Sequence, residues 1–483
     1  MRSPRFPSTP LATALLLVLT GVPASAASAA EPLPCVVLEG VNDRCPTWEA
    51  SYDGPTGGHD MPYGAALSPD GRVMVTAGDS AGANDSFDGV VVAHDTATGA
   101  RLWASRQDTS TAVEASDLLA DVTVGPSGER TYAVGASCGT WKVGASCDVL
   151  VLAYDLGSGA LRWSRRIDRS DQQLDAGFSV VAGADSEGSD VVYVLGRSLG
   201  DATDIDMLTM ALDGATGDER WSRRYDGHGG FDGASSIAVG GAGDDTVVIT
   251  GSSVGDEGVN ELATVAYDSR TGARTWVARH PTGIGQSVPN RAIVAGGRVF
   301  VSGASATSGS LIPSYMALAY DLRSGAPLWN ATYDAGSVDF ATDVAATPSG
   351  DQVVVTGMSR NPNYDFATVA YNGATGAQQW VARHDGVARD GDAAWSIAYD
   401  PATATYVTAG SSFVTGPGYL VALVAYSASG AKRWSAVRPG PGLLHAATPV
   451  HVVTTGGRTL VAAQIGHPAG TNIDSTVLAY AAE

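Results

Sequence analysis

The chain has 483 residues, with 29 Lys and Arg against 50 Asp and Glu, and a formal net charge of −21. This acidic balance argues against nucleic-acid binding, because phosphates need basic partners. The 60 glycines are spread along the chain and no long amphipathic helical pattern is present, which indicates an all-β protein.

The first 30 residues are typical of a secretory signal peptide. A basic start and an apolar run at residues 11–22 are followed by the small residues of PASAASAA. The run is shorter than the roughly 20 residues that span a membrane. We therefore expect cleavage between Ala26 and Ala30, a secreted protein with no membrane span, and a lead segment at residues 31–45.

Four cysteines in an exported chain indicate two disulfides. Cys35 and Cys45 lie together near the mature start, and Cys138 and Cys147 flank one loop. We expect local pairing, although the sequence leaves three connectivities open. Neither pair has C-x-x-C spacing, so we expect neither a zinc site nor redox chemistry.

A repeated segment ending in tryptophan divides the rest of the chain. AYDLGSGALRW at residues 153–163 recurs with changes as AHDTATGARLW, ALDGATGDERW, AYDSRTGARTW, AYDLRSGAPLW, AYNGATGAQQW and AYSASGAKRW. Two short strands joined by a tight turn precede each copy, as in GAALSPDGRVMVTAG. Each repeat therefore predicts four antiparallel strands, here named A to D, and tandem units of this kind form a β-propeller.

The two ends of the chain predict how the propeller closes. The last repeat ends at Glu483 without a strand D, whereas PTWEASYDG near the start is a strand D without a repeat of its own. We expect this segment, with Trp48, to complete the last blade and remove a free sheet edge. The prediction is a single domain over 46–483 with eight blades at about 62–107, 117–167, 175–225, 232–280, 288–333, 339–384, 392–438, and 445–482 plus 46–53.

The AxDxxTGxxxW segment resembles the tryptophan-docking repeat of the pyrroloquinoline-quinone (PQQ)-like eight-bladed propellers. Segments such as DFATVAYNGATGAQQWVARHDG are also similar to the bacterial propeller repeats known as SBBP. The resemblance extends from about Cys45 to Ala482. It implies an eight-bladed architecture, and either a quinone-dependent dehydrogenase or a scaffold without a cofactor, because the group contains both.

The segment GDSAG at Gly78–Gly82 matches the G-x-S-x-G pattern of hydrolase nucleophiles. GASCG, GRSLG and GSSVG recur at the same place, the end of strand B, in the next three blades. A nucleophile elbow is a single strained turn from a strand into a helix, and no helical pattern follows these copies. We therefore interpret Ser80 as part of the repeat and predict no catalytic residue.

In a propeller the D→A and B→C connections leave on one face, here called the upper face, and the A→B and C→D turns lie on the lower face. The upper connections are long, variable and acidic, and functional residues commonly lie on such loops. Before strand A one carboxylate recurs, and we expect these residues to ring the channel mouth: Asp60, Asp117, Asp175, Asp232, Asp339 and Asp392. A second set, expected further out on strand C, contains Asp88, Asp148, Asp206, Glu261, Asp365 and Asp474. The two sets indicate binding of a cation such as Ca²⁺ or of a basic ligand, or else each carboxylate binds backbone N–H groups of its own loop.

Blades 5 and 8 depart from this pattern, and a local site must break the symmetry. Blade 5 carries Asn290 and Arg291, and in blade 8 we assign His445 to the aspartate position. Trp395 lies outside the repeated tryptophan position, and it either stacks on a sugar or peptide or packs within its blade. These four residues and the six strand-A aspartates are the candidate binding residues.

The function that these patterns favour is an exported, monomeric, non-catalytic propeller without a cofactor. We expect it to bind a protein or an extracellular glycan of the cell envelope through its acidic upper face. A PQQ-dependent dehydrogenase is the first alternative, but the resemblance implies a disulfide between adjacent cysteines, and this chain has no such pair. The second is a propeller glycosidase or lyase, which needs a paired acid and base at the channel mouth.

Overall fold

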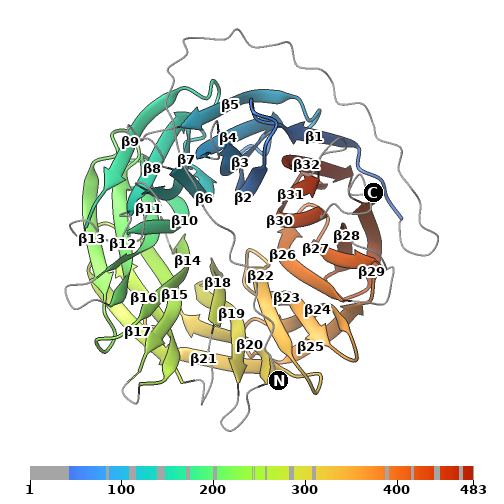
Figure 1. Ribbon diagram of the computed structural model, residues 1–483. Helices are drawn as coiled ribbons and strands as arrows, with labels where there is room; N and C mark the ends of the chain where they lie inside the picture. The colour runs from blue at the N-terminus through green and yellow to red at the C-terminus, as the bar shows by residue number, and fades with distance from the viewer. Residues whose placement is uncertain are drawn as a thin grey trace, which may run out of the picture.

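In the computed structural model, the described residues form eight four-stranded antiparallel sheets arranged as a ring around a central channel (Figure 1). The predicted eight-bladed all-β propeller is therefore confirmed. Residues 1–42, which contain the expected signal peptide and Cys35, lie outside the described residues. The described residues are 43–82, 86–107, 116–138, 147–169, 175–199, 204–241, 243, 245–255, 258–281, 288–306, 312–386, 391–414, 418–439, 447–466 and 472–481.

Each of the first four blades contains four consecutive strands, ordered from the channel to the rim. Blade 1 contains β2 (Asp60–Leu67), β3 (Val73–Ala81), β4 (Phe87–Asp95) and β5 (Arg101–Gln107). Blade 2 contains β6 (Ser116–Val124), β7 (Arg130–Cys138), β8 (Cys147–Asp155) and β9 (Leu161–Ile167). Blade 3 contains β10 (Ala176–Ala184), β11 (Asp190–Leu199), β12 (Ile205–Asp213) and β13 (Glu219–Tyr225). Blade 4 contains β14 (Asp232–Gly240), β15 (Thr246–Val254), β16 (Asn260–Asp268) and β17 (Arg274–His280).

The remaining blades repeat this order, and the last one also uses the N-terminal strand. Blade 5 contains β18 (Val288–Ala295), β19 (Arg298–Ala306), β20 (Pro313–Asp321) and β21 (Pro327–Tyr333). Blade 6 contains β22 (Asp339–Ala346), β23 (Gln352–Arg360), β24 (Tyr364–Asn372) and β25 (Gln378–His384). Blade 7 contains β26 (Asp392–Asp400), β27 (Thr405–Val414), β28 (Gly418–Ser427) and β29 (Lys432–Pro439). Blade 8 contains β30 (Ala447–Thr455), β31 (Arg458–Gly466), β32 (Ile473–Ala481) and β1 (Trp48–Tyr52).

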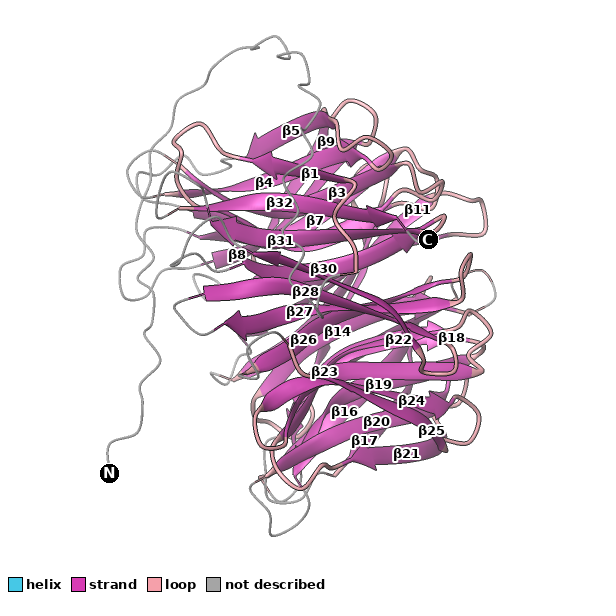
Figure 2. Ribbon diagram, turned by 90° about the vertical axis from the view of Figure 1, so that its right-hand side faces the viewer, coloured by secondary structure: helices cyan, strands magenta, loops and turns pink. Residues whose placement is uncertain are grey.

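The ring closes as the sequence predicts. Strand β1 pairs antiparallel with β32, so that Trp48 lies opposite Ala479 and Tyr52 lies opposite Ser475. The first and last segments of the domain therefore share one sheet. Figure 2 shows the ring from the side, with the strands running across its thickness and tight turns gathered at its right-hand end.

A tryptophan of strand D joins one blade to the next. Trp221 Nε1 donates a hydrogen bond to Ser269 O of the following blade at 2.8 Å. The ring lies over Gly272, which has φ +66°, and a Cβ atom there would lie 2.6 Å from Trp221 Cδ2. Glycine is therefore required at this turn for both backbone conformation and packing. The same hydrogen bond to the next blade is made by Trp103, Trp163, Trp276, Trp329 and Trp380.

The hydrophobic core lies between adjacent blades. Val134 and Val149 of blade 2, for example, pack with Val192 and Leu208 of blade 3. Because a blade with neighbours on both sides buries both faces, its middle strands are nearly continuous apolar runs such as VLVLAY. The ring is thus held together by side chains that are about 50 residues apart in the sequence.

Each innermost strand carries a β-bulge near its upper end. The register shifts between Ala394 and Ser396 in blade 7 and between Pro289 and Arg291 in blade 5. The other six innermost strands shift at the corresponding place. A bulge inserts one extra residue and re-aims its side chain. In blades 7 and 5 the extra residues are Trp395 and Asn290.

One predicted disulfide lies within the described residues. Cys138 and Cys147 lie opposite each other on β7 and β8 and are joined by a disulfide bond. Cys45 is also disulfide-bonded. The local pairing expected for Cys138 and Cys147 is confirmed.

Candidate binding site

The six strand-A aspartates lie at the upper ends of the innermost strands, but their side chains are buried. Each is at most 1% exposed, which favours the alternative in which each carboxylate binds groups of its own loop. The residues concerned are Asp60, Asp117, Asp175, Asp232, Asp339 and Asp392.

Backbone N–H groups explain why these carboxylates recur. Gly54 N–H donates to Asp60 Oδ2 at 2.7 Å, and Gly386 N–H donates to Asp392 Oδ2 at 2.6 Å. The same contact is made to Asp175, Asp232 and Asp339 by Arg169, Gly227 and Ala335. In all five blades the donor lies in the D→A loop just before the aspartate. These carboxylates therefore fix their own loops, as in the structural alternative to a binding role.

Ser80 of the GDSAG segment lies inside a polar network of blade 1. Its hydroxyl donates to Asp60 Oδ1 and accepts a hydrogen bond from Arg106. Arg106 also pairs with Asp88 at 2.5 Å. The Ser80 side chain is fully buried, so no substrate reaches its hydroxyl in this conformation. The network links one residue from each of the four strands of the blade.

Most of the strand-C carboxylates are neutralised by an arginine. In each of five blades an arginine of strand D pairs with the strand-C acid. These pairs are Arg106–Asp88, Arg166–Asp148, Arg224–Asp206, Arg279–Glu261 and Arg383–Asp365. Five of the six acids of the second predicted set therefore hold strand D against the rest of the blade.

Burial raises the pKa of three of the strand-A carboxyls. Loss of hydration raises the pKa of Asp60 and Asp232, and it raises the pKa of Asp392 to about 6. Hydrogen bonds from strand-B serines and loop N–H groups partly oppose the effect. A carboxyl of this kind is better suited to a structural role than to exchange of an external ligand.

The strand register corrects the assignment of His445. Asp392 pairs with Ser412 and lies two residues before Ala394, where the bulge of blade 7 begins. The corresponding residue of blade 8 is Ala447, two residues before Pro449. His445 therefore does not occupy the aspartate position, and it lies outside the described residues.

The bulged residues bring two of the predicted residues into equivalent places around the channel. Trp395 of blade 7 is 39% exposed, and its Nε1 donates to Ser411 Oγ at 3.0 Å. Tyr63, the bulged residue of blade 1, is equally exposed at 39%. Asn290 is the bulged residue of blade 5, and its amide donates to Ala341 O. Trp395 is thus held by a hydrogen bond while a large part of its ring remains accessible.

Arg291 belongs to a group of charged residues on the innermost strands, here called the axial cluster (residues 121, 291, 343 and 451). Arg291 Nε lies 3.7 Å from Asp343 Oδ1, and Ile397 N–H of blade 7 donates to Asp343 Oδ2 at 2.9 Å. Burial and the Arg291 charge lower the pKa of His451, while Asp343 and Asp121 raise it. Charges from blades 2, 5, 6 and 8 therefore influence one another across the channel. His451 and both aspartates escaped the sequence reasoning because the bulge defines their position.

Two further charged residues on strand B were missed from the sequence. Asp79 is 4% exposed, Leu119 N–H donates to its Oδ1 at 3.1 Å, and burial raises its pKa to about 7. Arg197 lies over the ring of Phe178, with Cζ 4.9 Å from the ring centroid. Both residues directly precede the strand-B serine of their blades, where other blades have Ala136 or Met358. The sequence could have indicated both residues, because each is charged at a repeat position that is uncharged in other blades.

Three groups of carboxylates have the geometry to share a cation: Asp206, Asp226 and Asp232; Asp365, Asp385 and Asp392; and Asp53, Asp60 and Asp474. In the first two groups an arginine already pairs with the strand-C acid. In the third, Ser51 occupies the register position of that arginine. Binding of Ca²⁺ stays a prediction.

The residues do not fit the PQQ site that the resemblance implies. The Cys138–Cys147 disulfide has a sequence separation of 9 and lies within blade 2, unlike a pair of adjacent cysteines. Arg291, a cation of the axial cluster, already pairs with Asp343. We derive no reaction step through PQQ.

Among the described residues, no helix combines the length and the apolar character needed to cross a membrane.

Comparison with known proteins agrees with the architecture. The family model described as outer membrane protein assembly factor BamB matches residues 148–409. Comparison with curated proteins gives no match.

Solved structures with similar folds differ widely in sequence from this chain. Sqt1 of Chaetomium thermophilum, bound to the N-terminus of the ribosomal protein L10, is 14% identical, with 91% of this chain and 100% of that chain covered and a TM-score of 0.54. Quinohemoprotein alcohol dehydrogenase of Comamonas testosteroni is 13% identical, with 93% and 78% covered and a TM-score of 0.53. BamB of Moraxella catarrhalis is 14% identical, with 88% and 97% covered and a TM-score of 0.49. At these identities the likeness to Sqt1 and to the alcohol dehydrogenase shows the fold alone.

Proposed function

The chain belongs to the family of the outer membrane protein assembly factor BamB, and from this premise we propose that it is an exported, non-catalytic propeller that binds a protein partner through its upper face. Family membership supports a scaffold role. The proposal includes secretion through the signal at residues 1–30 and a monomeric state without a cofactor.

The observation that carries the proposal is the placement of the exposed aromatic side chains. Among the described residues, the aromatic side chains with the greatest exposure are 39% to 47% exposed and all lie at the upper ends of strands or in upper loops: Tyr63, Phe231, Trp395 and Tyr419. Aromatic residues and arginine are enriched in protein interfaces, where a rigid ring gains contact area at low entropic cost. The exposed Arg291 lies on the same side of the ring.

The buried carboxylates also favour binding over catalysis. A general acid or base must be within reach of the substrate, whereas the strand-A aspartates are covered and hydrogen-bonded to their own loops. The surface that remains for a partner combines accessible rings with acidic loops. Such a surface suits a partner with basic and apolar residues.

Site-specific photo-crosslinking tests the proposal. A photoreactive phenylalanine analogue replaces Phe231, Trp395 or Tyr419 in turn, and the protein is exported from its producing cell. Leu102 and Leu161 on the outer strands are 46% and 41% exposed and serve as matched control positions. We expect one protein to crosslink to the upper positions and not to the controls. Equal labelling at both sets, or labelling of neither, would contradict a protein-binding upper face.

The other candidates have separate readouts. Binding to a glycan array that is lost in Trp395→Ala would assign the surface to a cell-envelope glycan. A retained chromophore after incubation with PQQ and Ca²⁺ would favour the dehydrogenase. Depolymerisation of an added polysaccharide would favour a glycosidase or lyase.

A further inference from the structure

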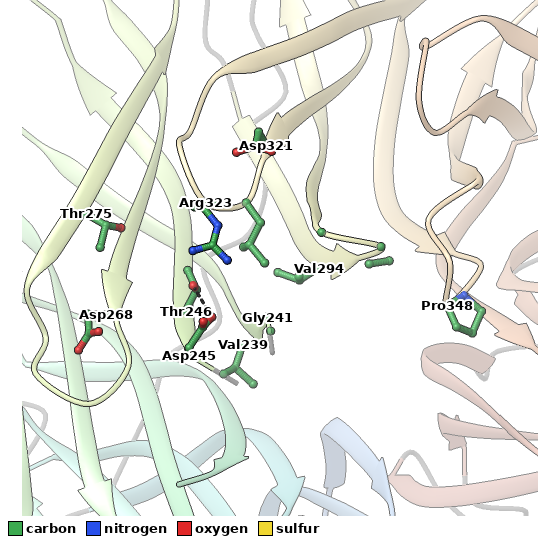
Figure 3. Close-up of a pocket in the computed structure, with 15 residues that line it drawn as sticks. Val239, Gly241, Asp245, Thr246, Asp268, Thr275, Val294, Asp321, Arg323 and Pro348 are labelled. Atoms are coloured by element: carbon green, nitrogen blue, oxygen red, sulfur yellow. Dashed lines mark hydrogen bonds between the residues drawn. The ribbon is translucent and has the colours of Figure 1, made fainter. Parts of the chain in front are cut away.

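A pocket of about 810 Å³ opens on the lower face at blades 4 and 5, on the side away from the exposed aromatic residues. It is lined mainly by the turn segments of these blades (Figure 3). Three carboxylates line it, those of Asp245, Asp268 and Asp321, and Arg323 is the one basic residue among its described lining residues. The lining is therefore acidic.

A short turn helps to open this pocket. In blade 5, Ala295 pairs with Arg298, so only Gly296 and Gly297 connect strands A and B. Both glycines have positive φ, at 55° and 73°, as a two-residue hairpin turn requires. In blade 4 the same connection runs from Gly240 to Thr246 and is longer. The reduced turn of blade 5 leaves space beside the lower end of blade 4.

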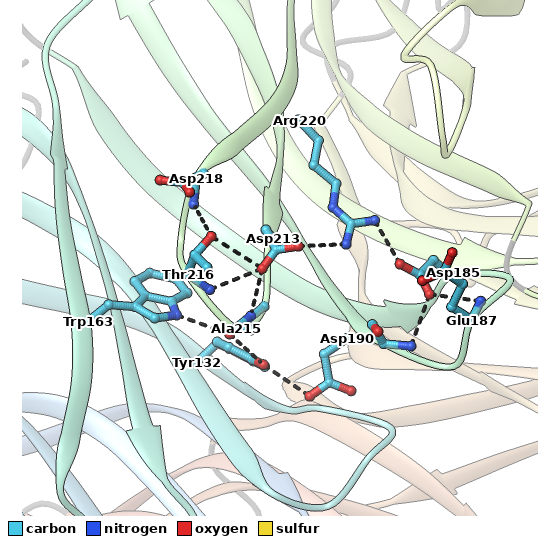
Figure 4. A network of polar contacts seen from close by, with 12 residues as sticks. Tyr132, Trp163, Asp185, Glu187, Asp190, Asp213, Ala215, Thr216, Asp218 and Arg220 are labelled. Atoms are coloured by element: carbon cyan, nitrogen blue, oxygen red, sulfur yellow. Dashed lines mark hydrogen bonds and ion pairs between the residues drawn. The ribbon is translucent and has the colours of Figure 1, made fainter.

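In the preceding blade a guanidinium joins two carboxylates of the lower turns. Arg220 of blade 3 lies 2.8 Å from Asp213 Oδ2, at the end of strand C, and 3.0 Å from Asp185 Oδ2, in the A→B turn (Figure 4). The side chain of Arg220 therefore links the two lower turns of its own blade. This is an internal example of a cation held by turn carboxylates of the lower face.

Blade 4 retains turn carboxylates but lacks the arginine. Thr275 takes the place of Arg220, directly before the repeat tryptophan, and Asp268 takes the place of Asp213. Asp245 lies in the A→B turn of the same blade and, like Asp268, lines the pocket. Neither forms an ion pair within the described part of the chain. Two carboxylates thus face a space in the region where blade 3 places a guanidinium.

We propose that this lower-face pocket binds a guanidinium or alkylammonium group, with Asp268 and Asp245 as its carboxylate partners. The ligand class is a basic side chain of a protein or a small organic cation of the same chemistry. The site is separate from the upper face and does not rest on the function proposed above.

The local hydrogen bonds keep Asp268 charged. Thr271 donates from its hydroxyl and its backbone N–H to Asp268 Oδ1, at 2.6 Å and 2.8 Å. These bonds, with the hydroxyl contributing most, lower the pKa of Asp268. They occupy Oδ1 and leave Oδ2 for a ligand. A charged carboxylate with one available oxygen is a suitable acceptor for N⁺–H donors.

Arg323 allows the direction of a change in ligand affinity to be predicted. Its exposed side chain extends into the pocket near Thr246 (Figure 3), and no ion pair to it is formed by the described residues. A fixed positive charge beside the site repels an incoming cation. Removal of Arg323 should therefore strengthen binding, whereas removal of Asp268 should weaken it.

The experiment is isothermal titration calorimetry of the purified protein with N-acetyl-arginine amide. The control ligand is N-acetyl-citrulline amide, which has nearly the same shape but no charge. We expect the citrulline compound to bind at least about tenfold more weakly. Asp268→Asn should lower the affinity by a similar factor, and Arg323→Ala should raise it severalfold. Thr275→Arg, which rebuilds the arginine of blade 3, should abolish binding.

Asp95→Asn is the matched control variant. Asp95 ends strand C of blade 1 and is capped by Thr98 as Asp268 is capped by Thr271, but it lies outside the pocket. This variant should bind like the wild type, and melting temperatures should show that every variant is folded. Equal binding of the citrulline compound, no binding of the arginine compound, or unchanged binding by Thr275→Arg would overturn the proposal.

A second titration identifies the source of the group. The peptide Gly-Gly-Arg-Gly-Gly presents the same guanidinium from a backbone. Tighter binding of the peptide than of N-acetyl-arginine amide assigns the pocket to a protein side chain, and the reverse assigns it to a small cation. Both results support the proposal, and neither depends on crosslinking at the upper face.

Discussion

Blades 6 and 7 solve the same packing problem in two ways. In blade 6, Arg383 pairs with Asp365 at 2.7 Å and donates to Ser359 Oγ at 2.6 Å. In blade 7 the corresponding register positions hold Val437 and Leu420, which are 4% and 5% exposed and pack in one apolar cluster.

The two blades keep the same strand order, so the ion pair is not needed to form a blade. A half-buried ion pair loses favourable hydration on folding, and the attraction between the two charges offsets this free-energy cost. Two apolar side chains need no such compensation. The ion pair of blade 6 is therefore needed for stability only because each of its two charges would otherwise be left without a partner.

The largest effect is expected from breaking the pair on one side. Arg383→Val leaves the Asp365 carboxylate and the Ser359 hydroxyl without their guanidinium, and should lower the free energy of unfolding by about 2–4 kcal/mol. Chemical denaturation at neutral pH measures the loss. Arg72→Val is the control, because Arg72 has an 83% exposed side chain in a surface pair. A loss for Arg383→Val no larger than for the control would contradict a stabilising network.

The second largest effect is expected at Asp79 of blade 1, a carboxyl that is buried without an arginine partner. Burial raises its pKa to about 7, above the roughly 3.9 of an unfolded chain. Its contribution to stability is therefore fully present below about pH 4 and is lost as the pH rises through 7. At pH 8 the free energy of unfolding of Asp79→Asn should exceed that of the wild type by about 1–3 kcal/mol, and the variant should therefore unfold at a higher temperature. Near pH 4 the two proteins should differ little.

Thermal unfolding at several pH values checks the sign of this effect. Asp351→Asn, at an exposed turn, is the control for the effect of the substitution itself. If the Asp79→Asn advantage is the same at pH 4 and pH 8, the buried carboxyl does not titrate in this range.

The smallest change is expected from the double variant Asp365→Leu with Arg383→Val. It copies blade 7 into blade 6 and removes both charges together, so its stability should lie within about 1 kcal/mol of the wild type. Denaturation curves of the two single variants and the double variant form a complete cycle. A double variant as unstable as Arg383→Val would show that blade 6 cannot adopt the apolar solution.

Much of the fold could be predicted because the repeat is defined by residues that are close together in the sequence. The tryptophan after each C→D turn and the glycine of that turn recur in the sequence at a regular spacing, and the last blade is recognised by its two separate ends. The pairing of Trp48 with Ala479 follows from counting strands. No knowledge of side-chain contacts is needed for that count.

The candidate site could be predicted only in part, because the sequence leaves two interpretations of the repeated aspartates open. Asp60 and Asp392 recur since each fixes its own loop, and their neighbours bury them. Trp395 and Asn290 reach the channel because of a bulge that shifts the register by one residue. The lower-face pocket could not be predicted from the sequence, because it results from a short turn and from the absence of an arginine that blade 3 contains.

The sequence by itself determined the number of blades and their strand order, since hairpin pairing and turn chemistry act between residues near one another in the chain. It also predicted the closure of the ring, because a strand D is missing from the last repeat and an unassigned strand D is present near the start. Only the tertiary structure decided which charges are buried, which rings remain accessible and where a pocket opens. Those properties depend on the adjacent blade, about 50 residues away, whose side chains exclude water from some positions and leave others in contact with it.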